Sequence, residues 1–228
     1  MTLTVSVIIP AFNEQERIGE SVGSVLRGGA DEVIVVDGGS TDDTEATAAA
    51  AGATVLRSER PGRAAQQNKG AALARGDVLL FLHADNRLHE SAIDAVRRRL
   101  QEELCLWGCF RQRVDAEGWG YRMIEAGNSW RARLLRYPYG DQAIFVRRRQ
   151  FDAVGGFADV CFMEDVLLSR ALRRRGRMAF LNGPLYVSAR RWKKRGLVAQ
   201  TIRNWCLLTA AVLGVSPNRL ARFYPHDR

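Results

Sequence analysis

A regular alternation of short apolar runs and helix-like segments across the first hundred residues constrains the fold most. The apolar runs lie at residues 5–10, 32–37, 54–57 and 78–82. The segments that follow them carry apolar residues at helical spacing, at 16–26, 44–51, 64–74 and 90–100. Continuous apolar strands separated by helices are typical of a mainly parallel sheet with both faces covered. The sequence therefore predicts an α/β fold.

After residue 100 the alternation becomes irregular. We expect strands at 106–114 and 143–147, helices at 121–135, 165–175 and 197–213, and short extended pieces at 178–181 and 186–188. No linker, repeat or low-complexity tract separates the two halves, and 228 residues are enough for one large core. We therefore expect a single domain over residues 1–228, in which residues 101–228 complete a site begun by residues 1–100 and end in a helix.

The chain is strongly basic, with a formal net charge of +9. Its arginines crowd the second half, in runs at 97–99, 147–149, 173–175 and 190–195, the last of which also contains lysines. Such an excess favours anionic partners, whether phosphates, nucleic acid or an acidic lipid surface. Basic runs at helix ends also complement the helix dipole, so several of these are explained as solvated helix faces.

The sequence carries no sign of export. Nothing before Val5 resembles a signal peptide, and the apolar run that starts there stops at Pro10. The longest late apolar run, at residues 206–215, is about half a membrane span. The four cysteines lack zinc-finger or disulfide spacing, so we expect reduced, packed thiols. We expect a cytoplasmic protein and leave open a peripheral contact with the inner face of the membrane.

Acidic residues follow three of the four predicted parallel strands. Glu14, Asp37 and Asp85 lie at or shortly beyond the ends of the first, second and fourth strands. Each alone is explained as a turn or first-turn helix residue. Ligands of open parallel sheets, however, bind beyond the carboxyl ends of the strands, so the joint placement of three acids favours a binding site. Carboxylates at such an edge can hold Mg²⁺ or Mn²⁺, which in turn bridges phosphates.

The loop after the third strand can supply the cations that a phosphate needs. Arg63 follows a Pro-Gly turn, and Lys69 lies six residues further on. A solvated helix face is the ordinary alternative for both residues.

These residues together resemble the family 2 glycosyltransferases, which have the GT-A fold. The resemblance is carried by SVIIPAFNE at 6–14, VVDGGSTDDT at 35–44, QQNKGAALARGD at 66–77 and FLHADN at 81–86. Downstream it is carried by YGDQAIFVRR, GGF, MEDV and SARRW. Within the family, HADN and GRAAQQNKGAALARGD are similar to a bacterial branch labelled radical-SAM/selenodomain-associated transferase 2, a label that names no substrate. The resemblance implies a Rossmann-type nucleotide-binding half and a mixed acceptor-side half.

The resemblance also implies an inverting, metal-assisted transfer from a nucleoside diphosphate sugar, with UDP-sugars favoured, to an acceptor hydroxyl. Glu14 and Asp37 would hold the base and ribose, and Asp85 would bind Mn²⁺ or Mg²⁺. The implied nucleotide-sugar-binding residues are Pro10, Ala11, Asn13, Glu14, Asp37, Gly38, Arg63, Asn68, His83, Ala84, Arg191 and Trp192. An anionic or phosphorylated acceptor fits the basic second half, and nucleic acid is not expected.

One departure from the family pattern concerns the metal site. The family's Asp-x-Asp becomes His83-Ala84-Asp85, so the first acid is missing. His83 would bond to ribose or to a metal-bound water, unless it is a structural histidine at a strand end.

Three acids compete for the role of general base, namely Asp165, Glu164 and Asp141. Adjacent side chains on a helix point about 100° apart, so only one of Glu164 and Asp165 should face the acceptor. The resemblance selects Asp165. Its place at a helix N-terminus predicts a lowered pKa.

Other classes of function fit parts of the pattern. A nucleotidyltransferase also uses a metal at a sheet edge, but the loop after the first strand lacks the glycines and cations typical of that class. A nucleic-acid-binding module would explain the basic second half with its interleaved tryptophans, yet the acidic edge opposes it. A catalytically degenerate sugar-nucleotide-binding protein would explain His83.

Overall fold

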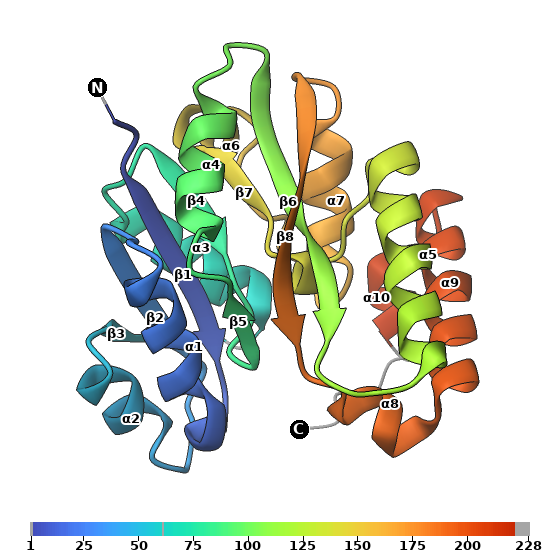
Figure 1. Ribbon diagram of the computed structural model, residues 1–228, viewed down its shortest axis with the longest axis horizontal. Coiled ribbons are helices and arrows are strands. Elements are labelled where there is room, and N and C mark those ends of the chain that lie inside the picture. The colour runs from blue at the N-terminus through green and yellow to red at the C-terminus, as the bar shows by residue number, and fades with distance from the viewer. Residues whose placement is uncertain (1, 61, 222–228) are drawn as a thin grey trace.

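An eight-stranded sheet forms the centre of the protein, in the order β3-β2-β1-β4-β7-β6-β8-β5 (Figure 1). The computed structural model describes residues 2–60 and 62–221. The strands are β1 (Val5–Ala11), β2 (Glu32–Asp37), β3 (Thr54–Arg57), β4 (Val78–Phe81), β5 (Asn86–Leu88), β6 (Cys105–Val114), β7 (Phe145–Arg147) and β8 (Arg177–Val187). The neighbours among β3, β2, β1 and β4 are parallel, and so are β6 and β8. β7 runs antiparallel to β4 and β6, and β5 runs antiparallel to β8.

Helices cover both faces of this sheet. They are α1 (Gln15–Arg27), α2 (Thr44–Ala50), α3 (Arg63–Leu73), α4 (Ala92–Leu100), α5 (Trp119–Leu135), α6 (Arg148–Ala153), α7 (Glu164–Leu172), α8 (Arg190–Arg195), α9 (Leu197–Val212) and α10 (Pro217–Ala221), with a short 3₁₀ helix η1 (Gly140–Gln142). All seven residues of β1 are buried, which explains its unbroken apolar sequence.

Alternate residues of β1 enter two separate cores. Val5, Val7 and Ile9 pack with side chains of α1 and α4 on one face. Ile8 packs with side chains of α3, α6 and α7 on the other. α3 lies so close to the sheet that a Cβ atom at Gly70 would come within 2.5 Å of Ile8 Cγ2. Any larger residue at that position would force the helix off the sheet.

The helices α5, α9 and α10 gather at one side of the sheet (Figure 1). α5 and α9 approach closely at their starts, where a Cβ atom at Gly120 would lie 3.1 Å from Leu197 Cδ1. A third apolar cluster joins α9 and α10 to the start of α7 through Leu207, Leu220 and Val166. Among the described residues, no helix is long and apolar enough to cross a membrane.

The expected α/β fold with a mainly parallel first half is confirmed, and β2 and β3 have the expected bounds. The second half differs in detail. The two extended pieces at 178–181 and 186–188 form one strand, β8, whose pairing with β6 shifts register between Phe110 and Arg111. The strand expected at 143–147 starts only at Phe145 because Ala143 has a positive φ of 47°. β5, η1, α6, α8 and α10 were not expected.

The cysteines are free, as expected, but only two of them are packed. Cys105 and Cys109 are buried, and burial raises the pKa of the Cys109 thiol to about 12. Cys161 and Cys206 are exposed, so the expectation of packed thiols is wrong for them.

Candidate active site

The loops after β1 and β2 are joined into one rim. Ala11 pairs with Asp37 at the carboxyl ends of the two strands. Beyond them, the Asn13 backbone N–H donates to Ser40 Oγ over 2.8 Å, and the Asn13 side chain accepts from the Thr41 N–H over 2.9 Å. Asn13 adopts a positive φ of 51°, which asparagine tolerates better than most residues. These contacts fix the two loops relative to each other.

Gln66 supports the same rim from α3. Its side-chain amide is buried and donates to the carbonyl oxygens of Ala11 and Val36, each over 2.8 Å. A Cβ atom at Gly38 would lie 3.0 Å from the Gln66 amide nitrogen. Gly38 is therefore needed for this close approach, and Gln66 acts as a brace between β1 and β2.

Asp37 is fully buried and shapes the loop that follows it. Its carboxylate accepts hydrogen bonds from the backbone N–H groups of Gly39 and Ser40, each over 2.8 Å, and from the Ser40 hydroxyl. This is the turn-forming role that was the ordinary alternative for Asp37. A contact between Asp37 and the base or ribose stays a prediction. The Asp37 side chain holds the loop after β2 with or without that contact.

Glu14 and Asp85 share one arginine. Arg190 Nη2 lies 2.8 Å from Glu14 Oε1 and 4.0 Å from Asp85 Oδ2. Burial raises the pKa of the Glu14 carboxyl and the charge of Asp85 adds to this, while the bond from Arg190 opposes it. The three residues come from the loop after β1, the loop after β4 and the start of α8. Two acids predicted from distant segments therefore lie in one cluster with a cation between them.

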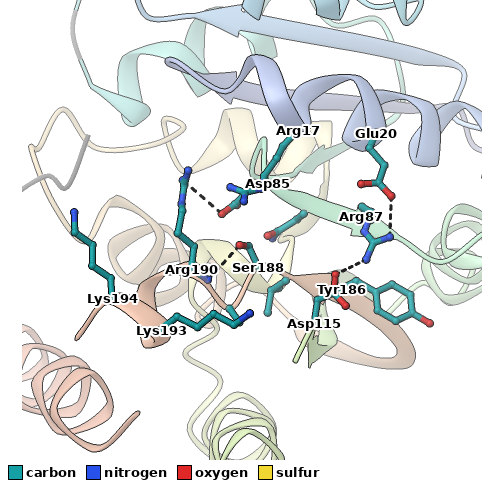
Figure 2. Close-up of a pocket in the computed structure, with 13 residues that line it drawn as sticks. Arg17, Glu20, Asp85, Arg87, Asp115, Tyr186, Ser188, Arg190, Lys193 and Lys194 are labelled. Atoms are coloured by element: carbon teal, nitrogen blue, oxygen red, sulfur yellow. Dashed lines mark hydrogen bonds and ion pairs between the residues drawn. The ribbon is translucent and has the colours of Figure 1, made fainter. Parts of the chain in front are cut away.

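A cavity of about 590 Å³ opens beside this cluster, between α1 and α8 (Figure 2). Arg87 in its wall is neutralised by Glu20 and Asp115, each at 2.8 Å. Arg17 and Lys193 also line it. We call this space the basic cavity.

A second, smaller cavity contains Asp165, His83 and Gly140. The Gly140 backbone N–H donates to Asp165 Oδ2 over 2.5 Å. A Cβ atom at Gly140 would lie 2.9 Å from His83 Nε2 and 3.3 Å from Asp165 Oδ2. Gly140 therefore lies between the imidazole and the carboxylate, and only glycine leaves both in place. We call this space the Asp165 cavity.

The environment of Asp165 raises its pKa to about 6. Burial is the main cause and the neighbouring charge of Glu164 the second, whereas Arg63 and hydrogen bonds from Gly140 and Val166 act in the opposite direction. The lowered pKa expected from the helix N-terminus is wrong, because desolvation outweighs the helix dipole at this half-buried position. Asp165 is consequently a stronger base than a surface aspartate and is still mostly ionised at neutral pH.

The two neighbouring acids at the start of α7 go to different places. Glu164 is buried and forms an ion pair with Arg63 at 3.0 Å, while Asp165 lines the cavity. The third candidate base, Asp141, lines the Asp165 cavity and also a neighbouring cavity that contains Asp85 and Trp192. His83 lines both as well.

The remaining predicted residues differ in their access to these cavities. Asn68 donates its amide to the Phe157 carbonyl over 2.8 Å and accepts from the Phe157 N–H over 2.9 Å, so it holds the loop before α7. Pro10 and Ala84 are buried beside the rim. Trp192 is buried with its indole ring in the core below α8. Arg191 belongs to α8, but its side chain lies outside the described residues.

Sequence reasoning did not select Arg190, Gly140 or Gln66. Arg190 is adjacent to the predicted Arg191, and the helical geometry that decides between two adjacent arginines is not visible in a sequence. Gly140 stood inside the quoted segment YGDQ, where a glycine before two polar residues was a usable signal. Gln66 carried no signal, because its partners are backbone carbonyls.

The fold and the rim place the protein among the α/β proteins of GT-A type. A crystal structure of glucosyl-3-phosphoglycerate synthase from Mycobacterium tuberculosis with Mn²⁺, UDP and glucosyl-3-phosphoglycerate matches with a TM-score of 0.65 at 22% identity, over 94% of this chain and 81% of that chain. The structure of S. aureus TarS 1–349 in complex with UDP-GlcNAc matches with a TM-score of 0.68 at 18% identity, over 82% of this chain and 58% of that chain. At these identities the likeness shows the fold.

The sequence matches the profile of "Glycosyl transferase family 2" over residues 6–163. The chain belongs to this family. A glucosyl-3-phosphoglycerate synthase from Mycolicibacterium paratuberculosis is 41% identical over 93 residues, which are 36% of this chain and 28% of that protein. The match thus spans less than a third of the relative. The narrower radical-SAM-associated branch stays a prediction.

Proposed function

We propose that the protein transfers a sugar from a nucleoside diphosphate sugar, with UDP as the favoured nucleotide, to an acceptor hydroxyl. The observation that carries this proposal is the position of His83 and Asp141 on the wall shared by two cavities. One cavity contains Asp165, a carboxylate suited to accept a proton, and the other contains Asp85, a carboxylate suited to a cation. The proposed base and the proposed leaving-group site therefore lie in two adjoining cavities.

Asp85 is the residue we propose for the divalent cation, Mn²⁺ or Mg²⁺. Among the described residues, no three His, Cys, Asp or Glu side chains lie close enough together to hold a metal by themselves. A single carboxylate, that of Asp85, suits a cation that takes one ligand from the protein and its other ligands from a diphosphate and water, as Mg²⁺ commonly does. The related structures that hold Mn²⁺ or Mg²⁺ together with UDP support the assignment. When bound, the cation would neutralise charge on the departing diphosphate.

Asp165 is the residue we propose as the general base. Its carboxylate accepts hydrogen bonds from the backbone N–H groups of Gly140 and Val166. Its raised pKa of about 6 lies close to neutral pH. It would take the proton of the acceptor hydroxyl as that oxygen attacks the anomeric carbon. Attack from the Asp165 side, with departure on the Asp85 side, inverts the anomeric configuration. Glu164 is paired with Arg63 and is the weaker candidate.

The rim loops and Arg190 would bind the donor. Asn13, Glu14 and the loop shaped by Asp37 form the nucleotide side, and Gln66 keeps it rigid. Without the donor, Arg190 neutralises the negative charges of Glu14 and Asp85. When the cation binds to Asp85, Arg190 would turn to the diphosphate.

The acceptor we propose is anionic or phosphorylated. The Asp165 cavity is also lined by Arg63, a cation on the side of the proposed base. A guanidinium at this wall favours an anionic group on the acceptor. A relative whose structure contains phosphoglyceric acid agrees with such an acceptor. We place the reaction in the cytoplasm.

The proposed function is tested with purified protein and a panel of UDP-, GDP- and dTDP-sugars with Mn²⁺. We expect a thermal shift with one nucleotide class and release of nucleoside diphosphate from it, both lost in Asp85→Asn. Arg87→Gln is the matched control, because Arg87 lines the same basic cavity but forms its ion pairs with Glu20 and Asp115. Pyrophosphate release from a nucleoside triphosphate would instead indicate a nucleotidyltransferase, and binding without turnover a degenerate member of the family.

A further inference from the structure

Large apolar side chains are exposed mainly on one part of the surface. Of the twelve large hydrophobic residues found exposed among the described residues, nine belong to α5, α9 or the turn after α9. On α5 they include Trp119, Met123, Trp130 and Leu134, and on α9 and its C-cap Val198, Ile202 and Leu213; each of these is more than half exposed. We call these seven residues the apolar face.

The apolar face follows helical geometry on both helices. At about 100° per residue, positions 119, 123, 130 and 134 fall within an arc of about 60°, and so do positions 198, 202 and 213. The opposite side of α5 carries the buried residues Glu125 and Ala132, and that of α9 carries Leu207 and Gln200. The two helices lie side by side (Figure 1). Each exposes one apolar stripe and turns buried residues to the protein.

The segments that carry the apolar face are rich in basic residues. Between residues 190 and 221 the chain has seven lysines or arginines and no acidic residue, and α5 has three arginines and a single acid, Glu125. Glu125 is buried and paired with Arg122 at 2.8 Å. Arg136 at the end of α5 and Lys193 on α8 are exposed. The surroundings of the face are therefore positive without a compensating surface acid in these segments.

We propose that the apolar face docks on an anionic lipid bilayer, with α5 and α9 lying in the plane of the headgroups. Paired stripes of Trp, Met, Leu and Ile flanked by arginine and lysine have the chemistry of an interfacial helix. Indole rings favour the boundary between headgroups and acyl chains, where one side of the ring is apolar and its N–H is solvated. Anionic headgroups would add electrostatic attraction for the flanking cations.

A second copy of the chain is the main competing occupant, and charge disfavours it. Two copies packed through this face would bring together the same basic surroundings, with a net charge of +9 on each chain. Like charges that face each other across an interface oppose association. A lipid surface of opposite charge meets both the apolar and the cationic part of the face.

Docking would also orient the proposed active site. α8 ends at Arg195 and α9 begins at Leu197, so the helix that carries Arg190 leads directly into the docking surface. The rim and the basic cavity would then lie near the headgroup layer. The docking itself does not depend on the proposed transfer reaction.

Vesicle sedimentation tests the proposal. The full chain is mixed with vesicles of phosphatidylcholine alone, or of phosphatidylcholine and phosphatidylglycerol in equal parts, at low and at high salt. We expect binding to the phosphatidylglycerol vesicles that weakens in high salt. The double variant Trp130→Gln/Ile202→Gln should lose roughly tenfold or more in partitioning, because two apolar anchors are removed. Its thermal unfolding should stay unchanged, since both side chains are exposed in this structure.

The control is Leu73→Gln/Leu104→Gln, which removes two exposed leucines outside the apolar face. Its partitioning should stay within about twofold of the unmodified chain. The proposal is overturned if the unmodified chain does not sediment with the anionic vesicles, or if the face variant sediments as well as the control. It is also overturned if the chain is a dimer in solution that the face variant converts to a monomer, because the face would then belong to a second copy.

Discussion

The backbone N–H of Gly140 points at Oδ2 of Asp165 from 2.5 Å, and a Cβ atom on the same glycine would lie 2.9 Å from His83 Nε2. One residue without a side chain thus separates the proposed base from the imidazole that replaces the family's first metal-motif acid. The relationship joins η1, α7 and the loop after β4, three segments far apart in the sequence. A methyl group at residue 140 would therefore displace the Asp165 carboxylate or the His83 imidazole.

Gly140→Ala should therefore reduce turnover by roughly a hundredfold, because displacement of a catalytic group by about 1 Å has an effect of that size. Thermal unfolding should change little. Gly127→Ala is the control, since a Cβ atom there meets no atom within 4 Å. Turnover by Gly140→Ala within a factor of about two of the unmodified chain would show that the spacing between His83 and Asp165 is unimportant.

The rate should depend on pH through Asp165. The base must be ionised to accept a proton, and its pKa is raised to about 6. kcat/KM should consequently fall as the pH drops through about 6 and reach a plateau above it. A rate profile measured with a buffer series checks this. A profile that stays flat down to about pH 4.5 would mean that the titrating group is an ordinary carboxylate or that Asp165 takes no part.

Arg190→Gln should strengthen binding of Mn²⁺ in the absence of nucleotide. The arginine lies between Glu14 and Asp85, so its removal leaves two carboxylates without their counter-ion. Titration of Mn²⁺ into both proteins measures the effect, with Arg87→Gln as control because Arg87 does not contact Asp85. Weaker Mn²⁺ binding by Arg190→Gln would show that Arg190 supports the cation site rather than competing with the cation.

Asp37→Ala should weaken donor binding and also destabilise the fold. The carboxylate accepts from two backbone N–H groups and one hydroxyl, and their loss should cost about 1–3 kcal/mol in the free energy of unfolding. The donor KM should rise more than kcat falls, because the loop binds the substrate in ground and transition states alike. Chemical denaturation and initial rates measure the two effects. A collapsed kcat with an unchanged donor KM would place Asp37 in the chemical step.

The first hundred residues were predictable because their strands are buried on both faces and their helices are short and regular. The rim acids Glu14 and Asp85 followed from the same regularity, since parallel strands bring their carboxyl ends to one edge. The pKa of Asp165 was not predictable, because its burial depends on η1 and α9, which are distant in sequence. The partnership of Asn68 with Phe157 was hidden for the same reason. β5 escaped notice because a three-residue strand has no periodicity to detect.

The proposed transfer depends most directly on Asp165, and comparison of binding with turnover in Asp165→Asn tests this role. Nucleoside diphosphate and Mn²⁺ should bind to the variant as they bind to the unmodified chain, because neither is proposed to touch Asp165. Turnover of the donor sugar should fall by roughly 10²- to 10⁴-fold, the usual contribution of a general base. Glu164→Gln, which removes the charge of the adjacent acid paired with Arg63, should keep a larger share of turnover. Normal turnover by Asp165→Asn, or a dead Glu164→Gln beside an active Asp165→Asn, would contradict the account.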